Sequence, residues 1–172
     1  MKHKKGHRRR QQRQRALMKQ GGFSLLDSLL AAGDQPMRLE RRTTMLLHMH
    51  TALDAVTRDA QPAVAHWRSL ADAVNLVQAL VELGWADDPA GVVTTAATEM
   101  GLAAVRYAET GTIRLSGAGV SAVTQTLATW ETAMDQLTER QVLYAKRYAV
   151  RRIYTALTGE HTEGVQIVEV GA

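Results

Sequence analysis

The residues from 120 to 137 read VSAVTQTLATWETAMDQL, and their large apolar side chains recur at alternating spacings of three and four residues. These side chains are Val120, Val123, Leu127, Trp130, Met134 and Leu137. This spacing puts all of them on one face of an α-helix that packs lengthwise against other helices. The stretch therefore predicts an all-α fold, with Ser116 as the helix cap.

Earlier segments repeat the helical spacing. One helix is expected to open near Pro36 and to end near Arg58, and the next to run from Pro62 to Gly84. The inward stripe of the first is Leu39, Met45, Leu46, Met49, Ala52, Leu53 and Val56. Another helix is predicted over 89–109, since Asp87 and Asp88 suit its positive end and Gly111 can close it.

A short amphipathic helix is predicted before these, over 23–33. Its apolar residues are Phe23, Leu25, Leu26, Leu29 and Leu30. Ser24 can cap its start and Gly33 can end it.

The apolar phase changes after Thr138. Thr138 and Gln141 match the capping-box pattern that marks a new helix start. The inward positions become Val142, Ala145, Ala149, Val150, Ile153, Ala156 and Leu157. Either the helix breaks near Thr138, or one long helix changes the neighbour against which it packs.

Two short segments have strand character. Residues 112–115 and 165–170 are rich in β-branched side chains and can form a small two-stranded ribbon. The predicted organisation is thus a basic arm over 1–20 that is flexible unless bound, a bundle of about five helices over 21–158, and an extended tail over 159–172.

Composition limits the function classes. With 172 residues and 45% hydrophobic residues, one folded core is expected. The absence of cysteine excludes disulfides, thiolate metal sites and a cysteine nucleophile. No apolar run has the length of a signal peptide or a membrane span, so we expect a protein of the host-cell cytoplasm or of a virion.

Charge is distributed very unevenly. The first twenty residues hold nine basic side chains and no acidic one, which gives +9. Residues 21–172 hold 12 basic and 17 acidic side chains, which gives −5. The formal net charge of +4 therefore conceals a basic arm on an acidic body.

The arm predicts contact with nucleic acid. Its candidate phosphate-binding residues are Lys4, Lys5, Arg8, Arg9, Arg10, Arg13, Arg15 and Lys19. The run Arg8-Arg-Arg-Gln-Gln-Arg-Gln-Arg15 resembles the arginine-rich motifs of viral and phage RNA-binding peptides. That resemblance implies an RNA or DNA partner, whereas the alternative is a solvated tail that aids solubility.

A second basic cluster is expected on the last helix. It comprises Arg140, Tyr144, Arg147, Tyr148 and Arg151, with Tyr154 in the same arc of about 120°. Rings between arginines can stack on bases or on a protein partner. Alternatively, Tyr144 and Tyr148 continue the earlier seam as edge-of-core residues.

Other motifs predict no catalytic chemistry, no metal and no cofactor. Gly117-Ala-Gly-Val-Ser-Ala122 fits a dinucleotide fingerprint, but helical sequence fills the space where a second strand is required. His48 and His50 are two residues apart on a helix, so they diverge and cannot share a metal. We therefore expect a non-enzymatic protein.

Residues 108–155 resemble small uncharacterised helical proteins of phages and prophages of proteobacteria, through Ile113-Arg-Leu-Ser-Gly117 and Trp130-Glu-Thr-Ala-Met134. This resemblance implies a mobile-element setting. The first hypothesis is a nucleic-acid-binding protein that acts through its arm, with a homodimer as one form. The alternative is a helical interaction module, such as a phage-encoded inhibitor or virion assembly component, that docks on a partner protein.

Overall fold

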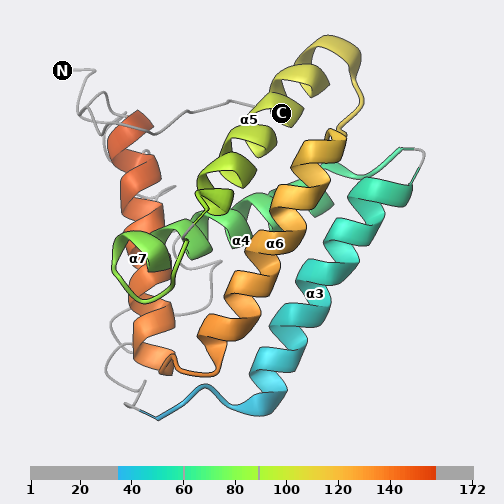
Figure 1. Ribbon diagram of the computed structural model, residues 1–172. Coiled ribbons are helices and arrows are strands. Elements are labelled where there is room, and N and C mark those ends of the chain that lie inside the picture. The colour runs from blue at the N-terminus through green and yellow to red at the C-terminus, as the bar shows by residue number, and fades with distance from the viewer. Residues whose placement is uncertain (1–34, 60, 89, 158–172) are drawn as a thin grey trace, which may run out of the picture.

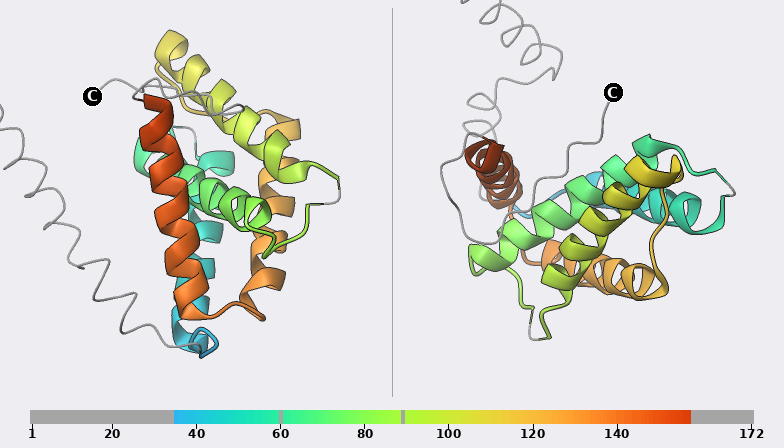
Figure 2. Two further views of the ribbon diagram at one scale, coloured as in Figure 1. Left: turned by 90° about the vertical axis from the view of Figure 1, so that its left-hand side faces the viewer. Right: turned by 90° about the horizontal axis from the view of Figure 1, so that it is seen from above.

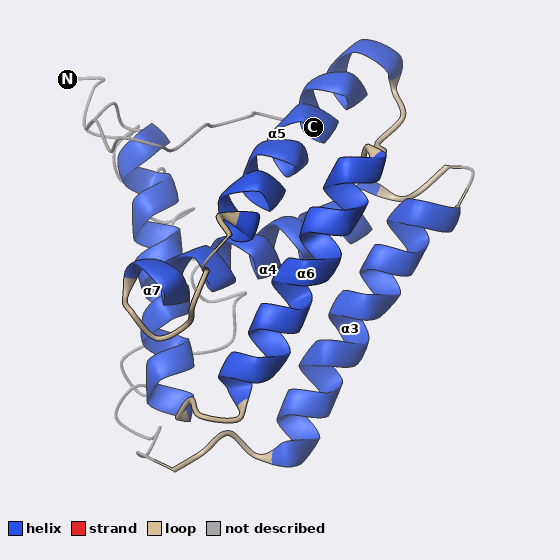
Figure 3. Ribbon diagram, viewed as in Figure 1, coloured by secondary structure: helices blue, strands red, loops and turns tan. Residues whose placement is uncertain are grey.

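The fold is an all-α bundle, as the sequence predicts. The computed structural model describes residues 35–59, 61–88 and 90–157, and within them it contains five helices and no strand (Figures 1 and 3). The helices are α3 (Leu39–Arg58), α4 (Val64–Glu82), α5 (Val92–Thr110), α6 (Gly117–Met134) and α7 (Glu139–Leu157). The arm over 1–20, the helix predicted over 23–33 and the tail over 159–172 lie outside the described residues.

The predicted caps end α4 and begin α5. Gly84 has φ of 70°, which permits the closing bonds from its amide to the carbonyl of Val81 and from the Trp85 amide to the carbonyl of Leu80. The Asp88 carboxylate accepts hydrogen bonds from the amides of Val92 and Val93, at 2.7 and 3.1 Å. A carboxylate at this helix end also interacts favourably with the helix dipole.

A break separates α6 from α7, which resolves the alternatives at Thr138. The Gln141 amide donates to the Thr138 hydroxyl at 3.2 Å, and the Thr138 amide donates to the Gln141 side-chain oxygen at 2.9 Å. This is the reciprocal pattern of a capping box. Because α7 is a separate helix, Tyr144 and Tyr148 do not continue the buried apolar face of α6.

The core centres on α4, which packs against all four other helices. α6 packs on α3, α4 and α5, and buries its predicted seam from Val123 to Met134. Trp130 is completely buried, and its indole contributes the largest fully buried side chain. The 3-4 spacing of α6 therefore specifies the centre of the bundle.

The entry to α6 also explains its glycines. The Ser116 hydroxyl accepts from the Gly119 amide at 2.9 Å and donates to Glu99 of α5 at 2.6 Å. A Cβ on Gly119 would lie 3.0 to 3.3 Å from atoms of Glu99 and Ser116, closer than normal packing allows. Gly119 therefore has a packing role where α6 approaches α5, whereas a Cβ on Gly117 would meet no atom within 4 Å.

Residues 112–115 form an extended link between α5 and α6 with no strand partner among the described residues. Ile113 anchors this link because its side chain is buried. The other half of the predicted ribbon, 165–170, lies outside the described residues.

The prediction for Leu39 was wrong. It was expected on the inward stripe of α3, but the residue is 73% exposed. The chain reaches the core two residues earlier, where Met37 is buried and its amide bonds to the carbonyl of Leu137 at 3.3 Å. This tertiary contact makes Met37 the inward residue in place of Leu39.

The helix α7 lies at one side of the bundle (Figures 1 and 2). Among the described helices it packs only on α4, through its buried residues Val142, Ala145 and Ala149. At the start of α7, Glu139 forms a partly exposed ion pair with Arg41 of α3, at 3.5 Å. No other described helix covers the remaining circumference of α7. No helix within the described ranges combines the length and apolar character needed to cross a membrane.

Candidate nucleic-acid interface

The candidate interface has two parts, of which only the second falls within the described residues. The arm residues Lys4, Lys5, Arg8, Arg9, Arg10, Arg13, Arg15 and Lys19 all lie outside the described ranges. The five residues predicted as a second surface, Arg140, Tyr144, Arg147, Tyr148 and Arg151, lie on α7 and are all exposed.

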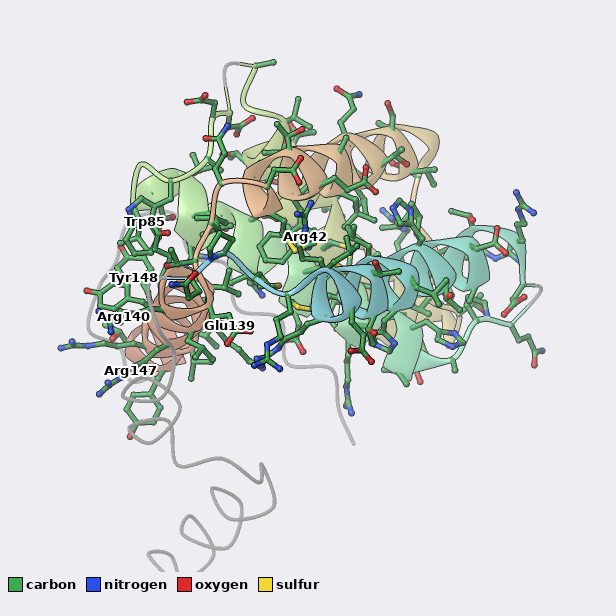
Figure 4. All side chains as sticks on the ribbon, turned by 90° about the horizontal axis from the view of Figure 1, so that it is seen from below. Arg42, Trp85, Glu139, Arg140, Arg147 and Tyr148 are labelled. Carbon is green, nitrogen blue, oxygen red and sulfur yellow. The ribbon has the colours of Figure 1, made fainter. Side chains whose placement is uncertain are left out.

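We call these five residues, together with Tyr154, the Arg–Tyr surface. Tyr144 is 49% exposed, Tyr148 36% and Tyr154 60%. The labelled side chains of Arg140, Arg147 and Tyr148 point away from the bundle on the same side of α7 (Figure 4). Because Arg140 and Tyr154 are fourteen residues apart, the surface is about 21 Å long, roughly the axial length of six nucleotides of one B-DNA strand.

The aromatic part of this surface is anchored to the bundle at one point. The ring of Tyr144 meets the ring of Trp85 edge-on, with centroids 5.7 Å apart and planes inclined at 60°. Such pairs stabilise by about 0.5–1.5 kcal/mol beyond their burial. Tyr144 therefore has a preferred orientation while half of its surface stays accessible.

The charge of the body is also divided between elements. α7 carries five basic side chains and one acidic one, a net charge of +4, whereas residues 35–138 carry seven basic and eleven acidic ones, a net charge of −4. The only acidic residue of α7 is Glu139, in its first turn. Along the rest of α7 no carboxylate of its own helix neutralises the arginines. Within the described body, a polyanion would therefore be attracted to the arginines on the outer side of α7 and repelled by the acidic remainder.

One arginine of α7 has a structural role that the sequence did not reveal. Arg152 points towards α4, forms an ion pair with Glu82 and donates to the side-chain oxygen of Gln78 at 2.8 Å. Its side chain is only 9% exposed. Its helical position, about 100° from Arg151, could have placed it on the buried side of α7. Its partners could not have been predicted, because they lie some 70 residues away in sequence.

Arg147 and Arg151 form no ion pair within the described residues, in contrast to Arg152. A guanidinium group that forms no ion pair keeps its N–H donors available for phosphate oxygens. Exposed tyrosine rings beside them can stack on bases or on the planar guanidinium of a neighbour. The arrangement is suited to binding and provides no nucleophile with an adjacent base.

The two histidines of α3 diverge, as their spacing predicts. His48 contacts the hydroxyl of Ser69 on α4 at 3.1 Å, and His50 contacts the carboxylate of Glu131 on α6 at 2.7 Å. Each ring thus interacts with a different helix. Within the described ranges no three His, Cys, Asp or Glu residues gather in a group that could hold a metal ion.

Comparison of the chain with protein-family models, with curated proteins and with solved structures gives no match in any of the three.

Proposed function

We propose that this chain is a non-enzymatic nucleic-acid-binding protein that contacts phosphates with its arm and with the Arg–Tyr surface of α7. The observation that carries the proposal is the segregation of charge: +9 on the arm and +4 on α7, against −4 on the rest of the described body. Attraction through two basic elements and repulsion elsewhere would orient the protein on a polyanion.

The Arg–Tyr surface supports this proposal chemically. Arginine binds phosphate through two parallel hydrogen bonds, and tyrosine rings stack on bases of any sequence. Neither interaction distinguishes RNA from DNA, so both are candidate ligands. The resemblance of 108–155 to phage and prophage proteins supports a mobile-element setting, in the host cytoplasm or in a virion.

The test is fluorescence anisotropy with labelled single-stranded RNA, single-stranded DNA and duplex DNA. If about six to nine charges meet phosphates, affinity for at least one ligand falls by about 10³ to 10⁵ between 50 and 200 mM salt. Replacement of Arg8, Arg9, Arg10, Arg13 and Arg15 by glutamine should remove most of this salt-sensitive binding.

The matched control replaces the interleaved Gln11, Gln12 and Gln14 by alanine. This variant keeps every arm charge, so its affinity should stay close to that of the unmodified protein if phosphates dominate binding. Equal affinities of the arginine variant and the unmodified protein would refute the role of the arm.

The exposed tyrosines favour a second candidate function. Three half-exposed rings on one helix provide an anchor surface for a protein partner, since tyrosine and arginine are enriched at binding hot spots. In that case the purified protein has the absorbance ratio of pure protein and a stoichiometric protein partner. A raised A260/A280 ratio that high salt removes supports nucleic-acid binding instead.

A further inference from the structure

An apolar groove lies between α3 and α7. Both helices pack on α4, but they do not pack against each other, so α4 forms the floor and the two helices form the walls. The groove has a volume of about 490 Å³. Its apolar lining includes Met37, Met45, Leu76, Leu143, Val150 and Ile153. We call this site the α3–α7 groove.

The charged side chains along the groove are compensated locally. Arg41 pairs with Glu139 across its end, at 3.5 Å. Lys146 lies close enough to Asp72 for its positive charge to lower the pKa of that carboxyl, against the larger effect of burial, which raises it. The part of the groove that a ligand could cover favourably is therefore its apolar surface, where Val150 is 59% exposed. This chemistry suits an apolar helix face better than a charged ligand.

The chain itself carries a segment of that chemistry shortly before Gln35 in sequence. Residues 23–30 read FSLLDSLL and place five apolar side chains on one predicted helix face, with Asp27 as the only charge. The described chain begins at the groove's end, where Gln35 accepts from the Glu139 amide at 3.3 Å and Met37 joins the lining. The segment is thus tethered to the mouth of the groove.

The length of the groove is compatible with the lengths of the 23–30 segment and of the chain that connects it to Gln35. From Val142 to Ile153 the α7 wall is about 16 Å long, and a helix over 23–30 is about 10 Å long between its end residues. The four residues 31–34, between this segment and the fixed Gln35, can span up to about 14 Å. A helix over 23–30 can therefore fold back along the groove, and its short tether gives it a high effective concentration there.

We propose that residues 23–30 dock as an amphipathic helix in the α3–α7 groove of the same chain. Docking covers Val150 and the half-buried Leu143, Ile153 and Met45. The groove borders the Arg–Tyr surface, because Leu143 and Val150 each lie one helical turn from Arg147 and Tyr154, respectively. The docking itself does not depend on nucleic-acid binding, and its test uses no nucleic acid.

The test is disulfide capture in the full chain, which has no cysteine of its own. Phe23→Cys, Leu26→Cys and Leu30→Cys are each combined with Val150→Cys, an exposed position whose replacement leaves the core intact. The matched control combines the same three substitutions with Leu102→Cys, which is 44% exposed on α5 and outside the groove. Disulfides form where Cα atoms approach to about 4.4–6.8 Å.

Docking predicts that at least one Val150 pair closes within the monomer, at least about tenfold faster than its Leu102 counterpart and independently of protein concentration. Equal rates in the two series would overturn the proposal. Capture that occurs only between two chains would also overturn it, because the groove would then hold the segment of a second copy. Salt-sensitive binding of nucleic acid is measured separately and can fail without affecting this result.

Discussion

The helices α6 and α7 are neighbours in sequence and nearly equal in length, yet they have opposite roles. α6 has one charged residue, Glu131, and packs on three helices. α7 has six charged residues and, of the described helices, packs only on α4. The difference shows that burial on several sides selects an uncharged seam, whereas attachment along one strip leaves most of a helix free to present charge. Four variants test this contrast.

The largest effect is expected at the centre of α6. Trp130→Ala should lower the free energy of unfolding by about 3–5 kcal/mol, because the indole is completely buried and its removal leaves a cavity. Chemical denaturation followed by circular dichroism measures this loss. Leu102→Ala, at an exposed position, should change it by no more than about 0.5 kcal/mol. Similar losses in both variants would contradict the burial of Trp130 in the core.

Removing a contact between α7 and α4 should lower the free energy of unfolding less than removing Trp130 from the core. Arg152→Ala removes the partner of Glu82 and Gln78 and should cost about 2 kcal/mol, less than a fully buried pair because Glu82 is 34% exposed. The neighbouring Arg151→Ala is the control and should leave stability within about 0.5 kcal/mol. If the two variants unfold at the same denaturant concentration, the Arg152 contacts do not secure α7.

The outer side of α7 should affect binding and leave stability unchanged. Arg147→Gln with Arg151→Gln should weaken nucleic-acid binding about tenfold, or about 1.4 kcal/mol, at about 100 mM salt, and flatten the salt dependence by a slope of about 1.4–1.8. Arg58→Gln with Arg68→Gln removes the same charge from the body and serves as the control in anisotropy measurements. Equal weakening by both pairs would mean that net charge acts without a defined surface.

The smallest effect is expected at Asp72, on the groove. Partial burial raises the pKa of its carboxyl, and the positive charge of Lys146 opposes this rise. The folded state therefore holds this proton more tightly than the unfolded chain, so its contribution is present below about pH 4 and is lost as pH rises through the folded pKa. Asp72→Asn should thus match the unmodified protein in acid and be more stable at neutral pH, by no more than about 0.5 kcal/mol because the partly buried side chain still has substantial contact with solvent. Thermal unfolding at the two pH values measures this difference, and a less stable variant at neutral pH would contradict it.

Local chemistry explains which parts of the fold could be predicted. The caps at Asp88, Ser116 and Thr138 and the closing Gly84 each act within a few residues, so the sequence displays both partners of every bond. Leu39 and Val150 are exposed despite their apolar character, because burial depends on the number of neighbours that a helix face meets. The sequence left open whether the helix breaks at Thr138, and that break places Tyr144 and Tyr148 at the surface.

The sequence by itself determined the helical class, the seam of α6, the caps and the basic character of both the arm and the last helix, because these follow from local spacing and residue type. Only the tertiary structure decided which described helix α7 packs on, namely α4, and that a groove lies between α3 and α7. It also decided that Arg152 is engaged, while Arg147 and Arg151 form no ion pair within the described residues. Those features depend on contacts between residues some 70 to 100 positions apart, such as Arg152 with Glu82 and Arg41 with Glu139. Such pairings are set by how the helices cross in space, and no local pattern encodes them.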